Sequence, residues 1–405
     1  MPEITNGTTY NSSHANGTSK RSIPSRLYHT HSPPALSDFK ALCSRSVTQS
    51  DYPLSIAVES NIPIYDLSRY SPSDAQTTTR LQDEWYHILH SGPGVFVVRS
   101  LSPDTSLLST VNSVYASIIA SEKTSTKGDH FASSGKNDRI WNSFGKHGLF
   151  DPSSFLQYYS NPWLPLLFSA WLGPAYRVTA QVNIVKPGGA PQVSHRDFHL
   201  GFQTTEDCAR FPKAMQHASQ LLTLQGAVAH SDMPLESGPT RFLPFSQTFE
   251  EGYMAYRLPE FNDYFLKYWV SLPLRMGDGV FFSPGLMHAA GENRTQDVER
   301  SANLLQISSA FGKTMETVDS APLVEKCWAG LREMYRDGKS EEVEAFVAAV
   351  AEGYPFPTNL DRRPPAPGGM APESEQDILR RGLKEDWSTE DVMVALAKIR
   401  EDSKV

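Results

Sequence analysis

Residues 277–288 of this chain read Gly277-Asp278-Gly279-Val280-Phe281-Phe282-Ser283-Pro284-Gly285-Leu286-Met287-His288. The order is a Gly-Asp turn, an apolar strand, a Pro-Gly corner and a histidine, which aims an imidazole toward the inside of a β structure. The segment lies within residues 175–310, where turns that contain Gly or Pro separate many of the short apolar runs. Several short strands with such turns predict a β-sandwich or a barrel. The apolar runs cover residues 178–185, 221–228, 240–243, 269–274, 279–282 and 303–308.

Helical patterns flank this β region on both sides. Before it, Ser71-Pro72-Ser73-Asp74 can cap a helix that ends at Ser91-Gly92-Pro93-Gly94, and Val95–Val98 then reads as a buried strand. A second helix is predicted over residues 104–121. Further helices are predicted over residues 323–336, 341–351 and 386–400.

We expect three parts along the chain. Residues 1–50 are rich in Ser, Thr, Asn and Pro, lack apolar periodicity and are predicted to be largely disordered. Residues 51–320 are expected to form one domain that joins the N-terminal helices to the β core. Residues 321–405 are expected to form a helical extension, interrupted by a segment rich in Pro and Gly.

The composition is that of a globular protein. Of 405 residues, 39% are hydrophobic and 20% are charged, which excludes a collagenous, coiled-coil or wholly disordered chain. Acidic residues outnumber basic ones by 45 to 37, so the formal net charge is −8. This balance disfavours a nucleic-acid partner and an anionic membrane surface. We therefore expect a small-molecule ligand.

Cysteine use and apolar run length bear on the compartment. The three cysteines form no Cys-x-x-Cys pair, which disfavours a disulfide framework or a cysteine-rich zinc site. No run of 18 apolar residues and no secretory leader is found. We therefore expect a cytoplasmic protein with reduced thiols. The C-terminal Ser403-Lys404-Val405 approximates the Ser-Lys-Leu address, which leaves a peroxisomal location as the weaker alternative.

Two His-x-Asp triplets are candidates for metal binding, His195-Arg196-Asp197 and His230-Ser231-Asp232. Either triplet alone is a weak signal, because such spacings arise by chance. On a strand, however, alternate residues point to the same face, so a His and an Asp two apart can bind one ion. His288 is the best candidate for a distal ligand. Two histidines and one carboxylate would leave three positions of an octahedral iron(II) ion open.

Two arginines follow His288 in the chain. Arg300 opens the apolar run that ends at Ser308, and its planar guanidinium can bind a carboxylate such as the distal one of 2-oxoglutarate. Arg294 lies in a polar loop and is the alternative anchor. Because loop arginines are usually solvated, we favour Arg300.

Three segments resemble the phytanoyl-CoA dioxygenase family in sequence and in order. They are VNIVKPGGAPQVSHRD at residues 182–197, DMPLESGPTRFLPFSQT at residues 232–248 and LRMGDGVFFSPGLMHAAGENRTQDVERSANLLQ at residues 274–306. The resemblance covers about residues 90–310 and is far more specific than one His-x-Asp triplet. It implies a mainly β fold with helical flanks, in which residues 51–320 form an oxygenase domain on a double-stranded β-helix (jelly-roll or cupin-like) core.

The resemblance also implies roles for individual residues. His195, Asp197 and His288 match the iron ligands of the family and would be the catalytic residues. Arg300 matches the anchor of the 2-oxoglutarate carboxylate. Gln192 matches a position that contacts the cosubstrate in some members of the family.

Other residues bear on the second triplet and on the substrate pocket. Asp232 matches a structural aspartate of the family, so the first triplet is the favoured metal site. The chain departs from the family pattern at Phe245-Ser246-Gln247, where Gly-Ser-His is usual, and this departure bears on the shape of the pocket. Candidate substrate contacts are Phe198, beside the triplet, and Trp141 and Arg139, which precede the β core.

The implied activity is oxidation of an unactivated C–H bond in a small metabolite, such as an amino acid or a specialised-metabolism intermediate. The enzyme would bind Fe(II) as a cofactor, consume 2-oxoglutarate and O2, and release succinate and CO2. Ascorbate could stimulate the activity. Asp197 disfavours halogenation, whereas hydroxylation, desaturation and oxidative cyclisation stay open. Two alternatives are a cupin-type metalloenzyme that does not use 2-oxoglutarate and a non-catalytic small-molecule-binding protein on the same scaffold. A homodimer is compatible with the sequence.

Overall fold

The computed structural model describes residues 23–123 and 137–404. Its strands are β1 (Ala57–Glu59), β2 (Ile62–Asp66), β3 (Val95–Arg99), β4 (Asn137–Ile140), β5 (Arg177–Val185), β6 (Thr223–Ala229), β7 (Arg241–Phe242), β8 (Gly279–Phe282), β9 (His288–Ala289) and β10 (Arg300–Ser308). Eight of them form one mixed sheet in the order β1-β2-β3-β8-β6-β10-β5-β4, while β7 pairs with β9 in a second sheet. Within the large sheet, β2 and β3 are parallel and the other neighbours are antiparallel.

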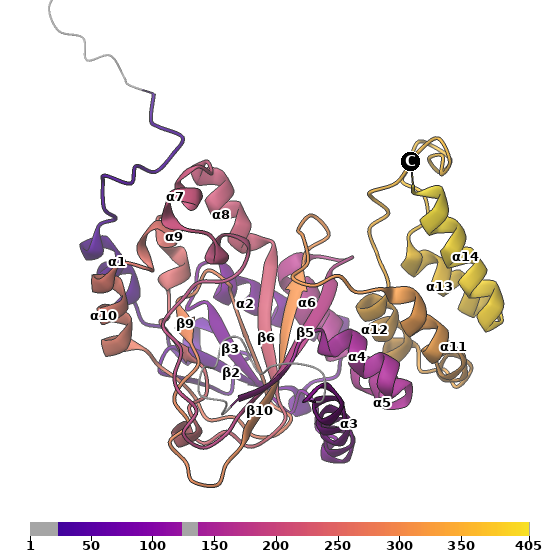
Figure 1. Ribbon diagram of the computed structural model, residues 1–405, viewed down its shortest axis with the longest axis horizontal. Helices are drawn as coiled ribbons and strands as arrows, with labels where there is room; N and C mark the ends of the chain where they lie inside the picture. The colour runs from indigo at the N-terminus through magenta and orange to yellow at the C-terminus, as the bar shows by residue number, and fades with distance from the viewer. Residues whose placement is uncertain (1–22, 124–136, 405) are drawn as a thin grey trace, which may run out of the picture.

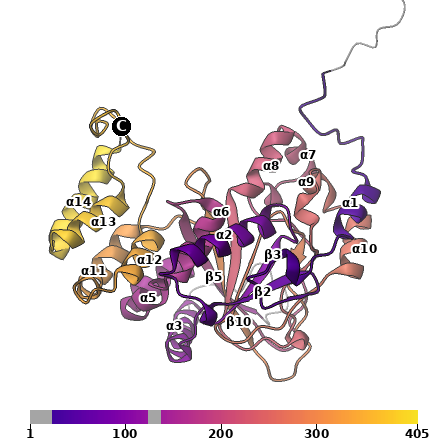
Figure 2. The same ribbon diagram turned by 180° about the vertical axis from the view of Figure 1, so that it is seen from behind.

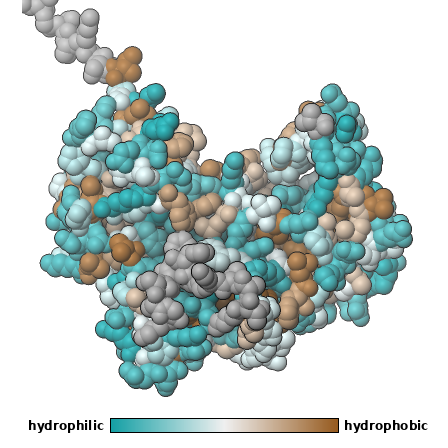
Figure 3. Space-filling view, in the orientation of Figure 1, coloured by the Kyte–Doolittle hydropathy of each residue, from teal (hydrophilic) through white to brown (hydrophobic). Residues whose placement is uncertain are grey.

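Helices surround the large sheet (Figures 1 and 2). Those before β5 are α1 (Leu36–Cys43), α2 (Ala75–His90), α3 (Thr105–Lys123), α4 (Ser143–Phe150), α5 (Pro152–Tyr159) and α6 (Trp163–Leu172). Those between β5 and β8 are α7 (Thr205–Ala209), α8 (Lys213–Leu221), α9 (Gly252–Ala255) and α10 (Pro259–Tyr268). Those after β10 are α11 (Ser320–Arg336), α12 (Ser340–Val350), α13 (Glu375–Lys384) and α14 (Thr389–Asp402). A notch in the molecular surface separates the end that carries α13 and α14 from the end that carries α7 and α8 (Figure 3).

The two faces of the large sheet have different partners. Because successive strand residues point to opposite faces, Phe96 and Val98 of β3 join the core formed with the helices, whereas Val95 and Val97 point the other way. Trp85 of α2 stacks on Phe96, with ring centroids 5.7 Å apart. The helices thus close one face of the sheet.

The other face is covered by the small sheet and its neighbouring loops. The apolar cluster that contains Val95 and Val97 also contains Phe242 of β7, Phe282 of β8 and Leu274, which precedes β8. Phe242 and Phe282 are in contact, with ring centroids 5.0 Å apart. The space between the two sheets is therefore lined by apolar side chains, and it is on this side that the candidate site lies.

The expected β core is present as a large mixed sheet with helices around it, but a mainly β chain is not what the structure shows. In the described residues, helices contain more residues than strands. Residues 269–274, predicted as a strand, contribute only single bridges at Val270 and Leu274. Pro273 lies between these two residues and has no N–H to continue a ladder, which explains the interruption.

The predicted disorder over residues 1–50 also needs correction. Residues 36–43 form α1, in which Phe39 is 1% exposed and lies 5.3 Å from Phe249 and 4.9 Å from Phe261, measured between ring centroids. Phe39 is the buried anchor of this segment, and Leu36 and Leu42 pack beside it against the same apolar cluster. So few apolar residues do not create a periodic pattern that stands out in a polar stretch. Residues 1–22 and Val405, the last residue of the peroxisomal-like tripeptide, lie outside the described residues. Over the described ranges, no helix combines the length and the apolar character that a membrane crossing needs.

Candidate metal centre

The structure brings His195, Asp197 and His288 together. The potential ligand atoms of these side chains all lie within 4.8 Å of one another. Asp197 Oδ2 is 3.9 Å from His195 Nε2 and 3.7 Å from His288 Nε2. His288 is buried, while the side chains of His195 and Asp197 are 28% and 16% exposed. The three donors therefore surround one point at the edge of a buried space.

Backbone hydrogen bonds create this arrangement. His195 and His288 form an antiparallel bridge, in which the N–H of each donates to the carbonyl of the other over 2.9 and 3.0 Å. The expected strand through His195 is limited to this bridge, because the N–H of Asp197 turns aside and donates to the carbonyl of Pro284 over 2.9 Å. The chain is nonetheless extended enough to place His195 and Asp197 on the same side.

Both imidazoles are held in the tautomer that suits a metal ligand. Nδ1 of His195 lies 2.8 Å from the carbonyl oxygen of Val193, and Nδ1 of His288 lies 2.8 Å from that of Leu286. A carbonyl can only accept, so each Nδ1 carries a proton, which leaves Nε2 as the nitrogen that can bind a metal. Burial lowers the pKa of His195, which also favours the neutral ring.

Asp197 is held as a carboxylate. Burial alone would raise the pKa of Asp197, but contacts with His288 and His195 and a hydrogen bond from Gln225 outweigh it, so the pKa lies below its usual range. Gln225 of β6 donates through Nε2 to Asp197 Oδ2 over 2.9 Å. Two imidazole nitrogens and one anionic oxygen fit an iron(II) ion. Sequence reasoning missed Gln225, since one amide within a strand gives no distinguishing signal.

Arg196, between the two ligand residues in the chain, points away from them and into a separate apolar cluster. Its side chain is 1% exposed, and Nη2 donates to the carbonyl oxygens of Ser246 and Phe249. The guanidinium also lies over the ring of Tyr253, with Cζ 5.6 Å from the ring centroid. These contacts fasten the segment that carries His195 and Asp197 to the chain around α9.

Substitution Gly252→Ala will lower the free energy of unfolding by about 1–3 kcal/mol, because a Cβ on Gly252 would overlap the buried guanidinium of Arg196. Chemical denaturation measures the loss. The control is Gly330→Ala in α11, where a Cβ would meet only the end of the Leu156 side chain and the stability should change little. Equal stability of the Gly252→Ala variant and the parent chain would show that Arg196 is not held in this way.

Arg300 and Arg294 occupy different environments. Arg300 begins β10 opposite Val185, is 6% exposed and donates through Nη1 to the carbonyl oxygens of Ser237 and Gly291, over 2.9 and 3.4 Å. Burial lowers its pKa to about 10, so it stays cationic at neutral pH. Its hydrogen bonds in the described part of the chain go to neutral carbonyls. Arg294 is exposed.

A cavity of about 580 Å³ adjoins the three ligand candidates and is lined by residues of both sheets. Arg300 and Gln192 line it, and Gln192 Oε1 accepts from the N–H of Ala290 over 3.1 Å. The apolar part of the wall includes Val97, Met233, Phe242, Leu274, Val280 and Phe282.

The three predicted substrate contacts do not all reach this cavity. Arg139 and Trp141 line it, with the guanidinium Cζ 4.9 Å from the ring centroid of Trp141. Phe198 does not line it, whereas Phe202 does. The reason is local: Phe198 is extended, with φ −104° and ψ −177°, so its side chain points to the side opposite Asp197. His199, with a φ of 60°, then starts a 3-10 turn.

His230 and Asp232 of the second triplet are held by hydrogen bonds within the fold and not by the group around His195. Nδ1 of His230 pairs with Asn112 Oδ1 over 2.7 Å, and Nε2 pairs with the hydroxyl of Tyr158 over 3.0 Å. Asp232 Oδ1 accepts from the N–H of Met276 over 2.9 Å and so holds the turn before β8. Both nitrogens of His230 are engaged, and neither residue belongs to the metal-ligand group.

The buried His230 will make stability depend on pH. Burial, and to a smaller extent His147, lowers the pKa of His230 to about 3, from about 6.5 in an unfolded chain. Between these values the unfolded chain binds a proton that the folded chain does not, so stability falls as the pH falls, by up to about 1.4 kcal/mol per pH unit. Chemical denaturation at several pH values between about 4.5 and 6.5 measures the free energy of unfolding as a function of pH. Its slope should be smaller in His230→Gln than in the parent chain, and unchanged in His217→Gln, where an exposed histidine is replaced. Equal slopes for His230→Gln and the parent would contradict the assignment.

Comparison with known proteins agrees with this geometry. Residues 93–302, just over half of the chain, match the family model described as phytanoyl-CoA dioxygenase (PhyH). "Dioxygenase trt7" of Aspergillus terreus is 27% identical over 145 residues, which are 36% of this chain and 45% of that protein. The matched part is thus less than half the length of this curated relative.

Solved structures of similar chains include two from nogalamycin biosynthesis. The α-ketoglutarate-dependent epimerase SnoN is 20% identical with a TM-score of 0.40, covering 58% of this chain and 85% of its own. The α-ketoglutarate-dependent carbocyclase SnoK is 19% identical with a TM-score of 0.43, covering 60% and 88%. The family match carries the assignment, and with it the expectation from sequence is confirmed: the chain belongs to the phytanoyl-CoA dioxygenase family of non-haem iron and 2-oxoglutarate dioxygenases.

Proposed function

We propose that this chain oxidises an unactivated C–H bond of a small metabolite in a reaction that consumes 2-oxoglutarate and O2 and releases succinate and CO2. The observation that carries the proposal is the presence, around one cavity, of the His195, Asp197 and His288 donor set and the buried cation Arg300. Hydroxylation, desaturation and oxidative cyclisation all begin from this arrangement, and an amino acid or a specialised-metabolism intermediate is the substrate class we favour.

We infer that the two sheets form a double-stranded β-helix. Along the chain, β6, β8 and β10 belong to the large sheet, whereas β7 and β9, which alternate with them, belong to the small one. The segment around His195 also joins the small sheet through its bridge to His288. Such alternation between two facing sheets is what winding a chain into a double-stranded helix requires, and it supports the cupin-like core.

Different residues bind the metal and the cosubstrate. His195, His288 and Asp197 hold iron, which, when bound with 2-oxoglutarate and O2, supplies the oxidising chemistry. Arg300 binds the distal carboxylate of 2-oxoglutarate, because a buried guanidinium whose partners are neutral carbonyls gains most from an anionic acceptor. Gln192, which lines the same cavity, contacts the cosubstrate.

The cavity selects and shields the substrate. Its apolar wall between the two sheets excludes water from the reacting centre, and its volume of about 580 Å³ suits a small molecule. Arg139 lies on β4, the edge strand of the large sheet, and Trp141 follows it. Both line the cavity and orient the substrate from this edge. Arg139 is itself positioned by Gln181 of β5, whose Oε1 accepts from Nη1 over 3.2 Å.

The test is release of succinate from 2-oxoglutarate in the presence of Fe(II), ascorbate and O2. We expect the parent chain to release succinate, and His195→Ala to lose at least about 99% of that activity, because one of three metal ligands is removed. His217→Ala, an exposed histidine on α8, is the matched control and should retain full activity. Succinate release that persists unchanged in His195→Ala would contradict the ligand assignment. Candidate metabolites can then be screened by their stimulation of turnover.

A further inference from the structure

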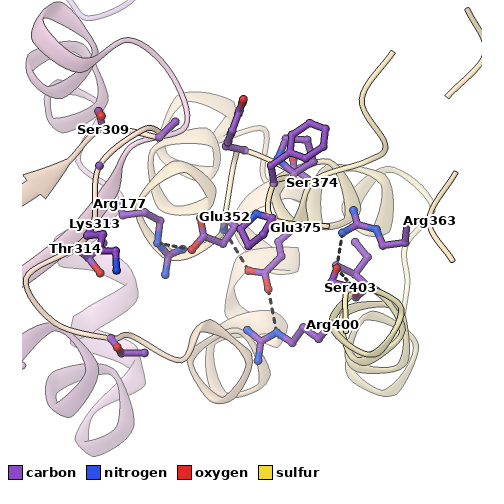
Figure 4. Close-up of a pocket in the computed structure, with 18 residues that line it drawn as sticks. Arg177, Ser309, Lys313, Thr314, Glu352, Arg363, Ser374, Glu375, Arg400 and Ser403 are labelled. Atoms are coloured by element: carbon purple, nitrogen blue, oxygen red, sulfur yellow. Dashed lines mark hydrogen bonds and ion pairs between the residues drawn. The ribbon is translucent and has the colours of Figure 1, made fainter. Parts of the chain in front are cut away.

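A second cavity, of about 570 Å³, lies where the C-terminal helices meet the end of the large sheet (Figure 4). Its walls come from the start of β5, the loop after β10, the chain after α12 and the last turns of α14. β5 and β10 pair along their full lengths, with Arg177 opposite Ser308 at this end and Val185 opposite Arg300 at the other. This cavity shares no lining residue with the cavity at the metal centre.

Positive charge exceeds negative charge in the walls. Four of the lining side chains are cations, namely Arg177, Lys313, Arg363 and Arg400, and two are carboxylates, Glu352 and Glu375. Glu352 pairs with Arg177, and Glu375 pairs with Arg400, each over 3.0 Å. Arg400 is also bound by Asp319, just outside the cavity, over 2.7 Å. The carboxylates are thus committed to two of the four cations.

Arg363 and Lys313 are the cations that this pairing leaves over. Arg363 is 9% exposed and donates to the hydroxyl of Ser403 over 2.8 Å and to the carbonyl oxygen of Glu373, which are both neutral acceptors. Lys313 is exposed at the mouth of the cavity, and no carboxylate of the described residues lies within salt-bridge distance of it. An anion would find two uncompensated charges at this place.

Arg177 supplies a donor that lacks an acceptor. The residue is 9% exposed, its Nε pairs with Glu352 and its Nη2 donates weakly to the carbonyl oxygen of Val318 over 3.5 Å. Its Nη1 is buried and makes no hydrogen bond. Because Nη1 has almost no accessible surface, the group of Arg177 that can bind an anion at the cavity wall is Nη2, whose one hydrogen bond to a carbonyl oxygen is long.

Aromatic rings stand beside these charges. Tyr354 and Phe356 line the cavity, and Phe311 packs edge-on against Tyr354, with ring centroids 5.5 Å apart. Tyr354 and Phe356 have ring centroids 5.7 Å apart. All three rings are partly open to solvent, at 37%, 42% and 76% for Tyr354, Phe356 and Phe311. Exposed rings grouped in this way offer faces and edges on which a flat ligand can stack.

We propose that this second cavity binds a small organic anion in which a phosphate or carboxylate is attached to a flat ring. The anionic group lies against Arg177, Arg363 and Lys313, and the ring lies against Tyr354 and Phe356. The volume is within the range of small-molecule sites, which is about 300–1,000 Å³. None of the metal-centre residues takes part, so this binding is independent of the oxygenase function.

Titration calorimetry on the full chain tests the proposal, with 5′-AMP as the ring-bearing phosphate and indole-3-acetate as the ring-bearing carboxylate. We expect at least one of them to bind with one-to-one stoichiometry and at least about tenfold more tightly than inorganic phosphate or adenosine, which each carry half of the recognised chemistry. Comparison of the two probes distinguishes a phosphate site from a carboxylate site. Absence of binding by both would overturn the proposal.

Two exposed substitutions locate the bound probe without disturbing the core. Lys313→Glu and Tyr354→Ala should each weaken binding by about tenfold, whereas Lys326→Glu, which makes the same charge change on α11 outside the cavity, should not. Succinate release should be the same in Lys313→Glu as in the parent chain. Unchanged affinity in both cavity variants would place the probe elsewhere and overturn the proposal, even if the oxygenase function were correct.

Discussion

Substitution Asp197→Asn will reduce succinate release by more than about a hundredfold while leaving the fold intact. The amide keeps the volume of the side chain and can still accept the hydrogen bond from Gln225. It removes the single negative charge from a group of donors whose other two members, His195 and His288, offer imidazole nitrogens. The affinity for Fe(II) depends on that charge, because hard divalent cations favour anionic oxygen donors.

Two measurements separate the loss of metal from other causes. Anaerobic titration with Fe(II) should show weaker binding by Asp197→Asn, and circular dichroism should show unchanged secondary structure. Asp263→Asn, at an exposed position of α10, makes the same chemical change away from the cavity and should behave as the parent. Parent-like Fe(II) affinity and turnover in Asp197→Asn would exclude Asp197 as a ligand.

Substitution Arg300→Met will raise the KM for 2-oxoglutarate by about a hundredfold. The methionine fills part of the space but removes a charged, planar donor from a buried position, and such a contact with a carboxylate contributes about 1.5–3 kcal/mol. The KM of Arg300→Lys should lie between those of the parent chain and Arg300→Met, because a lysine keeps the charge but cannot donate two parallel hydrogen bonds to a carboxylate. Succinate release as a function of 2-oxoglutarate concentration measures the change.

The matched control for this position is Arg294→Met, since Arg294 is exposed and was the alternative anchor in the sequence. Its KM for 2-oxoglutarate should stay at the parent value. A reversed result, with Arg294→Met impaired and Arg300→Met normal, would transfer the anchor to Arg294. Oxygen uptake that needs no 2-oxoglutarate and is unaffected by Arg300→Met would instead favour the cupin-type alternative.

The metal-ligand group could be predicted from sequence because its geometry is local at each end. Two side chains separated by one residue on an extended chain point to the same side, and a Pro-Gly corner followed by His288 forms a compact turn. The position of Arg300 beside the cavity was predictable for a similar reason, since Arg300 opens an apolar strand, and its role as the anchor stays a prediction. In each case the direction of the side chain is set by residues close to it in sequence, although the bridge that joins His195 to His288 links distant segments.

The parts that sequence reasoning missed depend on contacts between distant segments. Gln225 reaches Asp197 because β6 lies in the middle of the large sheet, and no short pattern reports which strand will lie there. Phe198 was misplaced because it is next to Asp197 on an extended segment, where adjacent side chains point to opposite sides. Helix α13 follows a stretch rich in Pro and Gly, which hides its capping box at Ser374.

The bridge between His195 and His288 has a consequence for how the site is assembled. These two residues are far apart in sequence, and bringing such distant positions together carries a loop-closure entropy that must be offset by some favourable contact. Here backbone hydrogen bonds between the two segments supply it during folding. Because this contact is made by main-chain atoms, substitution of either imidazole leaves the two segments joined, and the loss of a ligand need not open the sheet.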